Sequence, residues 1–215
     1  MSEDQREVRA IPSSDSYDLL LNVHYAGRIP SISYAFGLFV NGVLEGVVTY
    51  GSPPTSPVRK GLLGPEMADR VLELNRLCLR TNRRNDASFL VAHSLRLLPK
   101  GKAILSFADM AAGHTGAVYQ AANFTYCGLS AKRTDWKIKG MEHIHNQTIV
   151  DMFKGEKDRA GAARARFGDD FQLVPRSRKH RYVYFTGGKR DRREMAAALR
   201  YEVRAYPKAD GSDLI

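Results

Sequence analysis

Residues 71–109 read VLELNRLCLRTNRRNDASFLVAHSLRLLPKGKAILSFAD, and this stretch determines the fold class. Val71–Leu79 is apolar at most positions and predicts a strand. A polar, basic turn follows, and Ala87–Leu98 then carries apolar residues at helical spacing, so we expect a helix. A Pro-Lys-Gly run ends that helix, and Ala103–Ala108 is an apolar strand closed by Asp109. A strand, a helix and a strand in this order indicate an α/β fold.

A β-hairpin is predicted before this stretch. Two β-rich runs, Ser33–Val40 and Val43–Tyr50, flank the dipeptide Asn41 and Gly42. An Asn-Gly pair between such runs is a strong hairpin signal, because both turn positions need a positive φ. The following segment, 51–65, contains four prolines and is predicted to be a loop.

The remaining predicted elements extend the same alternation of strands and helices. They are strands at 5–12, 124–130 and 182–185, and helices at 17–23, 116–123, 149–153, 158–167 and 192–201. We therefore expect a single α/β domain over 1–215, a size that can bury a substantial core.

The distribution of charge is more informative than its total. The chain of 215 residues carries a formal net charge of +10. The window 132–204 holds 19 Lys and Arg against 10 Asp and Glu, whereas the rest of the chain is nearly balanced. A concentrated basic surface suits a polyanion, since binding phosphates releases counterions. We interpret 132–204 as a basic elaboration that binds nucleic acid; the alternative is solubilising surface charge.

Several basic residues are candidates for phosphate contacts, because they lie close to aromatic residues in the sequence. The bases of a nucleic acid could stack on such aromatics, which could equally be core residues of a strand. The candidates are Lys137, Lys139, Arg176, Arg178, Lys179 and Arg181, together with Arg28 in an earlier loop.

Composition also excludes some classes of protein. No apolar run approaches the roughly 18 residues of a membrane-spanning helix, so no membrane partner is expected. The first residues include an acidic pair and do not resemble a secretory signal. Two cysteines, Cys78 and Cys127, lie in apolar strand-like segments, which predicts buried reduced thiols rather than a disulfide framework. A cytoplasmic protein is the expectation.

The turn between the first strand and the helix of residues 71–109 is a candidate anion site. Free backbone N–H groups at a helix N-terminus attract phosphate, and Arg83, Arg84, Asn85 and Ser88 would surround it. The turn lacks the glycines and the Lys-Ser/Thr pair of a Walker loop. An ordinary capped surface helix is the alternative.

The end of the second strand is a candidate catalytic position. In open α/β sheets ligands collect at the carboxyl ends of strands, and Asp109 lies at such an end. His114 and Tyr119 follow close by. Asp109 could be a base or an orienting group and Tyr119 a general acid. Both residue types also serve commonly as caps and at the edges of cores.

An irregular loop near the N-terminus holds further candidates. His24, Tyr25 and Arg28 lie in a Gly- and Pro-containing segment that could form a substrate lid. Loop packing with solvent exposure is the alternative.

A histidine pair raises the question of a metal. His143 and His145, spaced by one residue, would share a face of a strand and could bind a metal with Asp109 or His24. Because no third ligand lies at a telling spacing, we predict no metal among the site residues, and iron stays open as a cofactor.

Several of these segments together resemble the Mom family of phage proteins and, more broadly, the GNAT fold of acyl-CoA N-acyltransferases. The resemblance covers roughly 20–187 and includes His24 and Tyr25. Its motifs are ELNRL at 73–77, NDAS at 85–88, SFAD at 106–109 and GHTGAVYQAANF at 113–124.

The resemblance implies a GNAT-like mixed central sheet with flanking helices and a DNA-modifying enzyme. Mom proteins convert adenine in phage DNA to N6-carbamoylmethyladenine, which protects that DNA from host restriction. The implied partners are double-stranded DNA and a small-molecule donor, either acetyl-CoA or another activated acyl donor, and a homodimer is possible. The catalytic positions carried over are Asp109, Tyr119, His24 and Tyr25, and the cofactor-binding positions are Arg76, Arg83, Arg84, Asn85 and Ser88.

The chain departs from the GNAT pattern in one turn. Residues 81–86 lack the Arg/Gln-x-x-Gly-x-Gly/Ala motif that holds the CoA pyrophosphate, so CoA sits differently or another donor is used. Simple acetyl transfer could not make an alkylated amine that bears an amide. Two other functions stay open: a GNAT acyltransferase for another amine, and a DNA-binding protein without enzymatic activity. The basic charge argues against the first, and the lack of a recognisable DNA-binding motif argues against the second.

Overall fold

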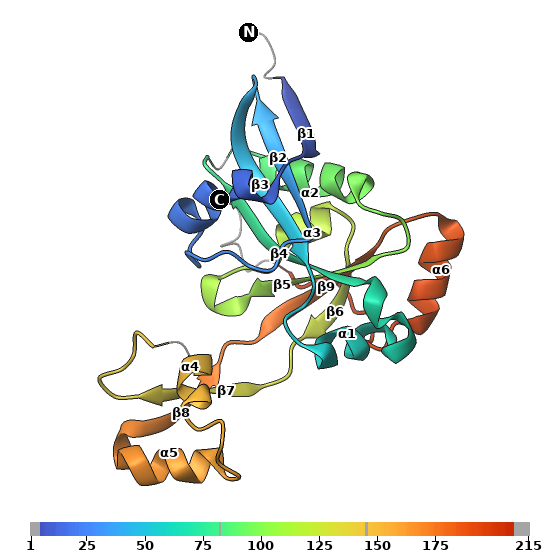
Figure 1. Ribbon diagram of the computed structural model, residues 1–215. Helices are drawn as coiled ribbons and strands as arrows, with labels where there is room; N and C mark the ends of the chain where they lie inside the picture. Colours follow the sequence, from blue (N-terminus) through green and yellow to red (C-terminus); the bar gives the residue numbers. More distant parts are fainter. Residues whose placement is uncertain (1–4, 82, 145, 209–215) are drawn as a thin grey trace.

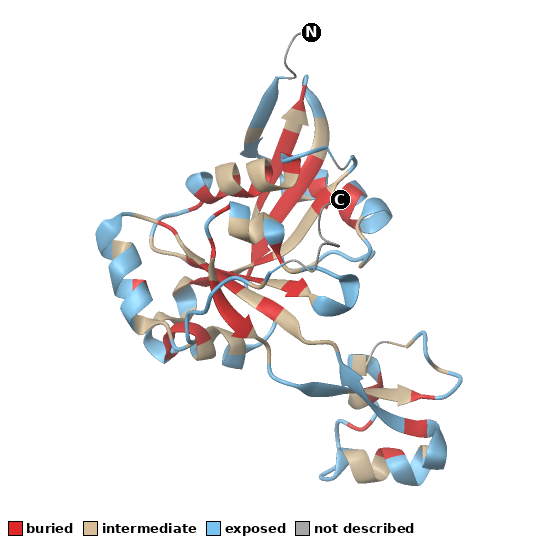
Figure 2. Ribbon diagram, turned by 180° about the vertical axis from the view of Figure 1, so that it is seen from behind, coloured by how far each residue is buried: buried red, intermediate tan, exposed pale blue. Residues whose placement is uncertain are grey.

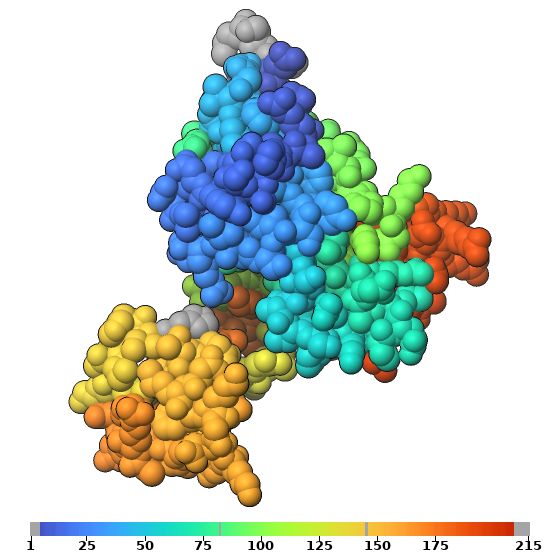
Figure 3. Space-filling view, in the orientation of Figure 1, coloured from blue at the N-terminus to red at the C-terminus, as the bar shows by residue number. Residues whose placement is uncertain are grey.

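A main body and a smaller lobe make up the molecule in Figure 1, a computed structural model that describes residues 5–81, 83–144 and 146–208. The body is built on one large twisted sheet. The lobe, residues 131–178, projects from one end of the body, as the space-filling view in Figure 3 also shows. The predicted mixed α/β fold class is confirmed.

Seven strands of the described residues form the main sheet in the order β1-β2-β3-β4-β5-β9-β6, and β7 pairs with β8 in the lobe. The strands are β1 (Arg6–Ala10), β2 (Tyr34–Val40), β3 (Val43–Gly51), β4 (Val71–Leu79), β5 (Ala103–Asp109), β6 (Thr125–Leu129), β7 (Arg133–Ile138), β8 (Phe171–Arg176) and β9 (Lys179–Phe185). The helices are α1 (Ser56–Leu63), α2 (Asp86–Leu97), α3 (Ala117–Ala121), α4 (Asn146–Asp151), α5 (Arg159–Phe167) and α6 (Lys189–Ala198). Short 3₁₀ or π turns are η1 (Ser13–Ser16), η2 (Leu19–Val23), η3 (Pro65–Arg70), η4 (Met110–Ala112) and η5 (Gly168–Asp170).

The predicted hairpin is confirmed. Strands β2 and β3 pair antiparallel and close with Val40 opposite Val43. The two turn residues between them, Asn41 and Gly42, have φ of 49° and 82°. Positive φ at both positions matches the right-handed twist of the flanking strands.

The parallel pair β4 and β5 is unusually short, and this shapes the centre of the body. Pairing runs only from Val71 opposite Ala103 to Glu73 opposite Leu105, although both strands continue. Just beyond this point β4 also bulges against β3. Thr49 and Tyr50 of β3 stand opposite residues 76 and 74, so no residue of β3 stands opposite Asn75. The two strands therefore diverge and leave a wedge between them.

Apolar layers cover both faces of the main sheet. On one face Leu90 and Leu95 of α2 pack against buried residues such as Phe124. On the other face Leu62 of α1 and Met195 of α6 pack together. Figure 2 shows this burial along the strands of the body and a second, separate buried group inside the lobe.

One predicted loop is wrong. The segment 51–65 was expected to lack regular structure because of its prolines, but Ser56–Leu63 forms helix α1. Pro57 lies in the first turn of that helix, where a missing N–H group breaks no hydrogen bond. Pro65 then begins η3, and Gly64 between the two elements has φ of 90°.

The lobe is an insertion between β6 and β9 with its own small core. Ile138, Ile149, Ala163 and Phe171 are buried there, and Trp136 packs against them. Strands β7 and β8 were missed from the sequence. Only 132–178 of the basic window 132–204 lies in the lobe, since β9 belongs to the main sheet and α6 covers the body.

A close backbone approach next to the wedge can be tested with Gly51→Ala. A Cβ on Gly51 would overlap the carbonyl oxygen of Ser31, so the loop before β2 would have to move. We expect a loss of about 1–3 kcal/mol in the free energy of unfolding, as for other overpacked sites, measured by urea denaturation. Gly155→Ala is the control, because its Cβ would meet no atom within 4 Å. Equal stability of the two variants would contradict this account.

Candidate active site

The wedge between β4 and β5 is lined by polar groups at the point where pairing stops. The Ser106 hydroxyl donates to the carbonyl oxygen of Leu74 at 3.2 Å, so it satisfies a backbone acceptor that the opened ladder leaves free. Tyr119 on α3 packs against the apolar layer of this face, and its hydroxyl interacts with Ser106. Burial raises the pKa of Tyr119, the hydrogen bond with Ser106 opposes this, and the nearby Tyr25 and Glu73 raise it further.

Glu73 is a site residue that the sequence reading missed. It is half-buried, and burial raises the pKa of its carboxyl, although the positive charges of Lys179 and Arg76 oppose the shift. A carboxyl with a raised pKa in such a place is a candidate general base. The available signal was an acidic residue between the buried apolar residues Leu72 and Leu74 of β4.

The loop that holds His24 and Tyr25 is fixed to the bulge of β4. Asn75 donates from Nδ2 to the carbonyl oxygen of Ser31 at 2.8 Å and accepts from the Thr49 hydroxyl at 2.7 Å. The Ser33 N–H donates to the carbonyl oxygen of Tyr50 at 2.7 Å. The bulged residue therefore positions the loop beside the wedge.

His24 and Tyr25 form a stacked pair, with ring centroids 4.4 Å apart. Nδ1 of His24 accepts from the Ala26 N–H at 3.0 Å, which places the ring's proton on Nε2. Burial lowers the pKa of His24, and the charge of Arg76 lowers it further, so the neutral ring is favoured. Tyr25 is 85% exposed and offers an aromatic face to a ligand. His24 and Tyr25 on the loop, Arg76 on β4 and Tyr119 on α3 therefore lie around the wedge.

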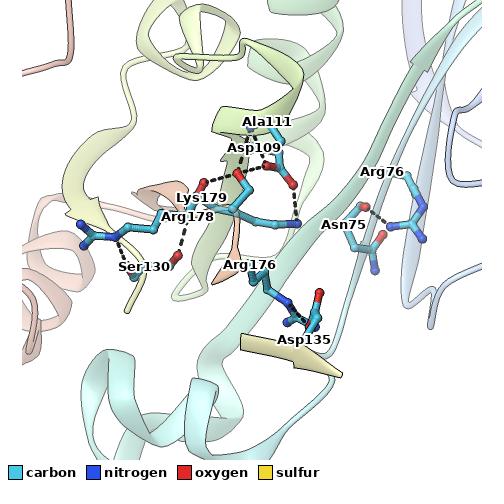
Figure 4. A network of polar contacts seen from close by, with 10 residues as sticks. Asn75, Arg76, Asp109, Ala111, Ser130, Asp135, Arg176, Arg178 and Lys179 are labelled. Carbon is cyan, nitrogen blue, oxygen red and sulfur yellow. Dashed lines mark hydrogen bonds and ion pairs between the residues drawn. The ribbon is translucent and has the colours of Figure 1, made fainter. Parts of the chain in front are cut away.

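Asp109 lies at the edge of this group and holds the lobe. Its Oδ1 accepts from the Ser177 hydroxyl at 2.8 Å and from the Ala111 N–H at 3.0 Å, and its Oδ2 pairs with Lys179 Nζ at 3.2 Å (Figure 4). Burial alone would raise the pKa of Asp109, but these hydrogen bonds outweigh it and the pKa is lowered. Asp109 is therefore an ionised carboxylate with its oxygens in use. Lys179 connects it electrostatically to Glu73.

The two chain segments that join the lobe to the body, one at Ser130 and one at Arg178, are hydrogen-bonded to each other. Ser130 accepts with its carbonyl oxygen from Arg178 Nε at 2.7 Å and with its hydroxyl from the Lys179 N–H at 2.9 Å. The Met110 N–H donates to the carbonyl oxygen of Arg178 at 3.2 Å. Both chain segments that join lobe and body thus end in one network.

The predicted anion site lies away from the wedge. Leu79 lies six positions after Glu73 on β4, about 20 Å at roughly 3.3 Å per residue, and the turn begins only after Leu79. The buried Asp86 carboxylate pairs with Arg6 at 3.2 Å at the start of α2.

The turn itself does not fit a GNAT pyrophosphate loop. Asn85 has φ of 68°, and the Ser88 hydroxyl donates to its carbonyl oxygen at 3.0 Å. Arg83 and Arg84 are exposed cations, but the residues described here include no glycine that would let a pyrophosphate approach the backbone. We therefore assign no catalytic step to CoA.

Most of the predicted DNA-binding residues also make contacts within the chain. Arg176 pairs with Asp135 at 2.6 Å, and Lys137 Nζ lies 3.5 Å from the carbonyl oxygen of Glu142. Arg181 donates to the carbonyl oxygen of Cys127 at 3.2 Å and stacks on Tyr201. Lys139 in the lobe and Arg28 beside the wedge are exposed.

Three further predictions concern metals, cysteines and membranes. Within the described ranges no group of three or more His, Cys, Asp or Glu could hold a metal ion, and His145 lies outside those ranges. Cys78 and Cys127 are free and buried, as expected, and burial raises the pKa of the Cys127 thiol to about 11. No helix among residues 5–81, 83–144 and 146–208 is long and apolar enough to cross a membrane.

Comparisons with solved structures return acetyltransferases at low similarity. An N-acetyltransferase from Staphylococcus aureus is 11% identical with a TM-score of 0.45, over 84% of this chain and 98% of that one. A GNAT-family acetyltransferase from Bacillus cereus is 12% identical with a TM-score of 0.45, over 86% and 99%.

Sequence comparison is more specific. The Mom protein family matches residues 5–208, almost the whole chain. Methylcarbamoylase Mom of Escherichia phage Mu is 32% identical over 198 residues, which cover 86% of this chain and 76% of that protein. An α/β protein with a polar wedge at its centre is the class that the fold defines, and within that class this chain belongs to the Mom protein family.

The raised pKa of Glu73 predicts a specific dependence of stability on pH. Because the folded protein holds this proton more tightly than the unfolded chain does, stability falls as the pH rises from the ordinary value of 4.5 through the folded pKa. Glu73→Gln removes this loss, so we expect the variant to gain stability relative to the wild type across that range. Urea denaturation between about pH 4 and about pH 8 measures the effect. Glu66→Gln, at an exposed position, is the control; parallel profiles for wild type and Glu73→Gln would contradict the assignment.

Proposed function

We propose that this protein modifies adenine in double-stranded phage DNA to N6-carbamoylmethyladenine and so protects that DNA from host restriction. Membership of the Mom family over nearly the full chain carries this proposal. The site supports it, because a half-buried carboxyl, a half-buried tyrosine, a neutral histidine and an arginine converge at the wedge.

The proposed reaction is a nucleophilic transfer onto the exocyclic amine. The adenine leaves the base stack and enters the wedge, with Tyr25 as an aromatic surface for it. N6 forms a bond to the methylene carbon of the two-carbon unit, and the bond from that carbon to the leaving group breaks with its electron pair on the leaving group.

Two residues manage the protons of this transfer. The lone pair of N6 is delocalised into the ring, so its proton becomes acidic only as the new bond forms, and Glu73 then accepts it. The Tyr119 hydroxyl donates a proton to the leaving group. His24 orients the amine, and Asp109 keeps the lobe and Lys179 in position.

The donor is an activated small molecule in this proposal. The step as written needs a donor that carries its leaving group on the methylene carbon next to a carboxamide. Acetyl-CoA and other acyl donors, the two predicted classes, carry the leaving group on the carbonyl carbon and do not supply this step. Arg83, Arg84, Asn85 and Ser88 stay the predicted contacts of CoA. A homodimer and a cytoplasmic location in an infected bacterium also stay predictions, and we propose no role for iron.

DNA from bacteria that express the protein provides the first test. Digestion to nucleosides and mass spectrometry should show a deoxyadenosine heavier by one carbamoylmethyl group. In Glu73→Gln or Tyr119→Phe the yield should fall about 100-fold or more, the usual contribution of a general acid or base, while duplex binding is retained. Unmodified adenine from soluble wild-type protein would contradict the proposed function. Equal losses of DNA binding and modification would contradict the two assigned roles.

Binding of DNA by the lobe has a separate test. Lys137 and Lys139 on and after β7 would each contact a phosphate, so the double change to Gln should lower the slope of log K against log salt by about 0.9 per lost contact. Fluorescence anisotropy with a duplex measures this slope. Arg190→Gln with Arg193→Gln removes the same charge from α6, on the side of the body away from the lobe (Figure 1), and should change the slope less. A larger change in the salt slope for the α6 variant than for the lobe variant would place the DNA on α6.

A further inference from the structure

Two arginines from different elements meet beside the wedge. Arg76 lies on β4 just after the bulge, and Arg28 lies in the loop 24–31. The side chain of Asn75, the neighbour of Arg76, donates to the carbonyl oxygen of Ser31 at 2.8 Å, so the loop that carries Arg28 is held against β4 beside Arg76. Burial lowers the pKa of the Arg76 guanidinium, and the positive charge of Arg28 lowers it further. Like charges held together repel, so the arrangement needs an opposite charge between them.

Among the described residues no carboxylate forms an ion pair with either arginine, although the charge of Glu73 favours the charged form of Arg76. By contrast, Arg70 and Arg80 at the two ends of β4 pair with Glu194 at 3.1 Å and Asp18 at 2.6 Å.

The guanidinium of Arg76 is also incompletely satisfied. Its Nη1 donates to the carbonyl oxygen of Asn75 at 2.6 Å, but its Nε is buried without a hydrogen-bond acceptor among the described residues. Glu73 acts on Arg76 only at longer range. A buried donor on a cation that lacks an acceptor is unfavourable in the free protein, and an incoming anion would relieve this.

The position of Arg28 is set by the same contacts that set the wedge. The bulged Asn75 bonds the loop through the carbonyl oxygen of Ser31, and Gly51 permits the close approach of loop and strand. An anion that binds here meets a loop already held against the strand at its end, and this lowers the entropy lost on binding.

We infer that Arg28 and Arg76 form one binding site for an oxyanion, a phosphate or a carboxylate, next to Glu73 and Tyr119. Guanidinium groups bind both anions through paired N–H donors. In the proposed reaction, on which this inference rests, the oxyanion is a phosphodiester beside the extruded adenine or an anionic group of the donor.

Inorganic phosphate is a probe that needs neither donor nor DNA. At constant ionic strength, phosphate should raise the melting temperature of the wild type in a saturable manner, because it binds only the folded protein. Arg28→Gln and Arg76→Gln should each lose this shift, and Arg76→Lys should keep part of it. Arg70→Gln, which removes a charge already paired with Glu194, should respond like the wild type.

DNA binding by the same variants distinguishes the two sources of the anion. If the anion is a phosphodiester, the slope of log K against log salt falls by about 0.9 for each arginine lost. If it belongs to the donor, the slope stays at the wild-type value although the phosphate shift is lost. An unchanged phosphate shift in both Arg28→Gln and Arg76→Gln would overturn the inference, and Arg28→Gln, at an exposed loop position, is the variant least able to disturb folding.

This outcome is separable from the proposed function. The phosphate-dependent shift in melting temperature is measured without DNA or donor, so its presence or absence tests the oxyanion site even if the protein does not modify adenine. Conversely, modified adenine with no phosphate effect would leave the function in place and remove only the oxyanion site.

Discussion

The early end of the parallel pairing between β4 and β5 is the constraint on which the site depends. Beyond Glu73 and Leu105 the backbone groups that face the gap lose their ladder partners, while β4 stays paired with β3 and β5 with β9. A buried carbonyl without a donor is unfavourable. The Ser106 hydroxyl supplies that donor, and Tyr119 reaches the same point from α3. Because the gap opens in the middle of the sheet, groups from α3, β4 and the loop 24–31 approach one place.

Two sets of hydrogen bonds fix the chain segments on either side of this gap. The bulge at Asn75 holds the loop that carries His24, and the Asp109 carboxylate holds the neck of the lobe through Ser177. Lys179 joins Asp109 to Glu73 by its charge. A carboxylate so engaged is poorly placed to accept a proton, and this is why its contribution is better understood as the position it gives to the lobe.

Much of the body could be predicted from the sequence, because its signals are local. The Asn-Gly hairpin and the alternation over 71–109 need only turn chemistry and periodicity. Helix α1 departs from the predicted loop because Pro57 lies in its first turn, where a proline breaks no helical hydrogen bond. Strand β7 was missed because its sequence, RTDWKI, is mostly polar, and a lobe with so small a core needs few apolar residues.

The candidate site was predictable only in part, for a related reason. His24, Tyr25, Arg76 and Tyr119 lie in recognisable motifs, and the structure brings them together. The contact of Asp109 with Ser177 spans 68 residues and depends on where the lobe is inserted, so no local pattern reports it. Glu73 was hidden because one acidic residue in an apolar strand reads as a surface position, when here it faces the opened ladder.

The charges around Glu73 explain how one carboxyl can serve as a base in this site. Burial alone would keep it protonated, whereas Lys179 and Arg76 favour the ionised form and limit the rise in its pKa. A general base is most effective when its pKa lies near the operating pH, since it must be free of its proton and still able to take one. An adenine in the wedge would exclude water and strengthen both effects together. The balance between burial and the two cations, rather than either alone, is therefore what suits Glu73 to accept a proton from a weakly nucleophilic amine.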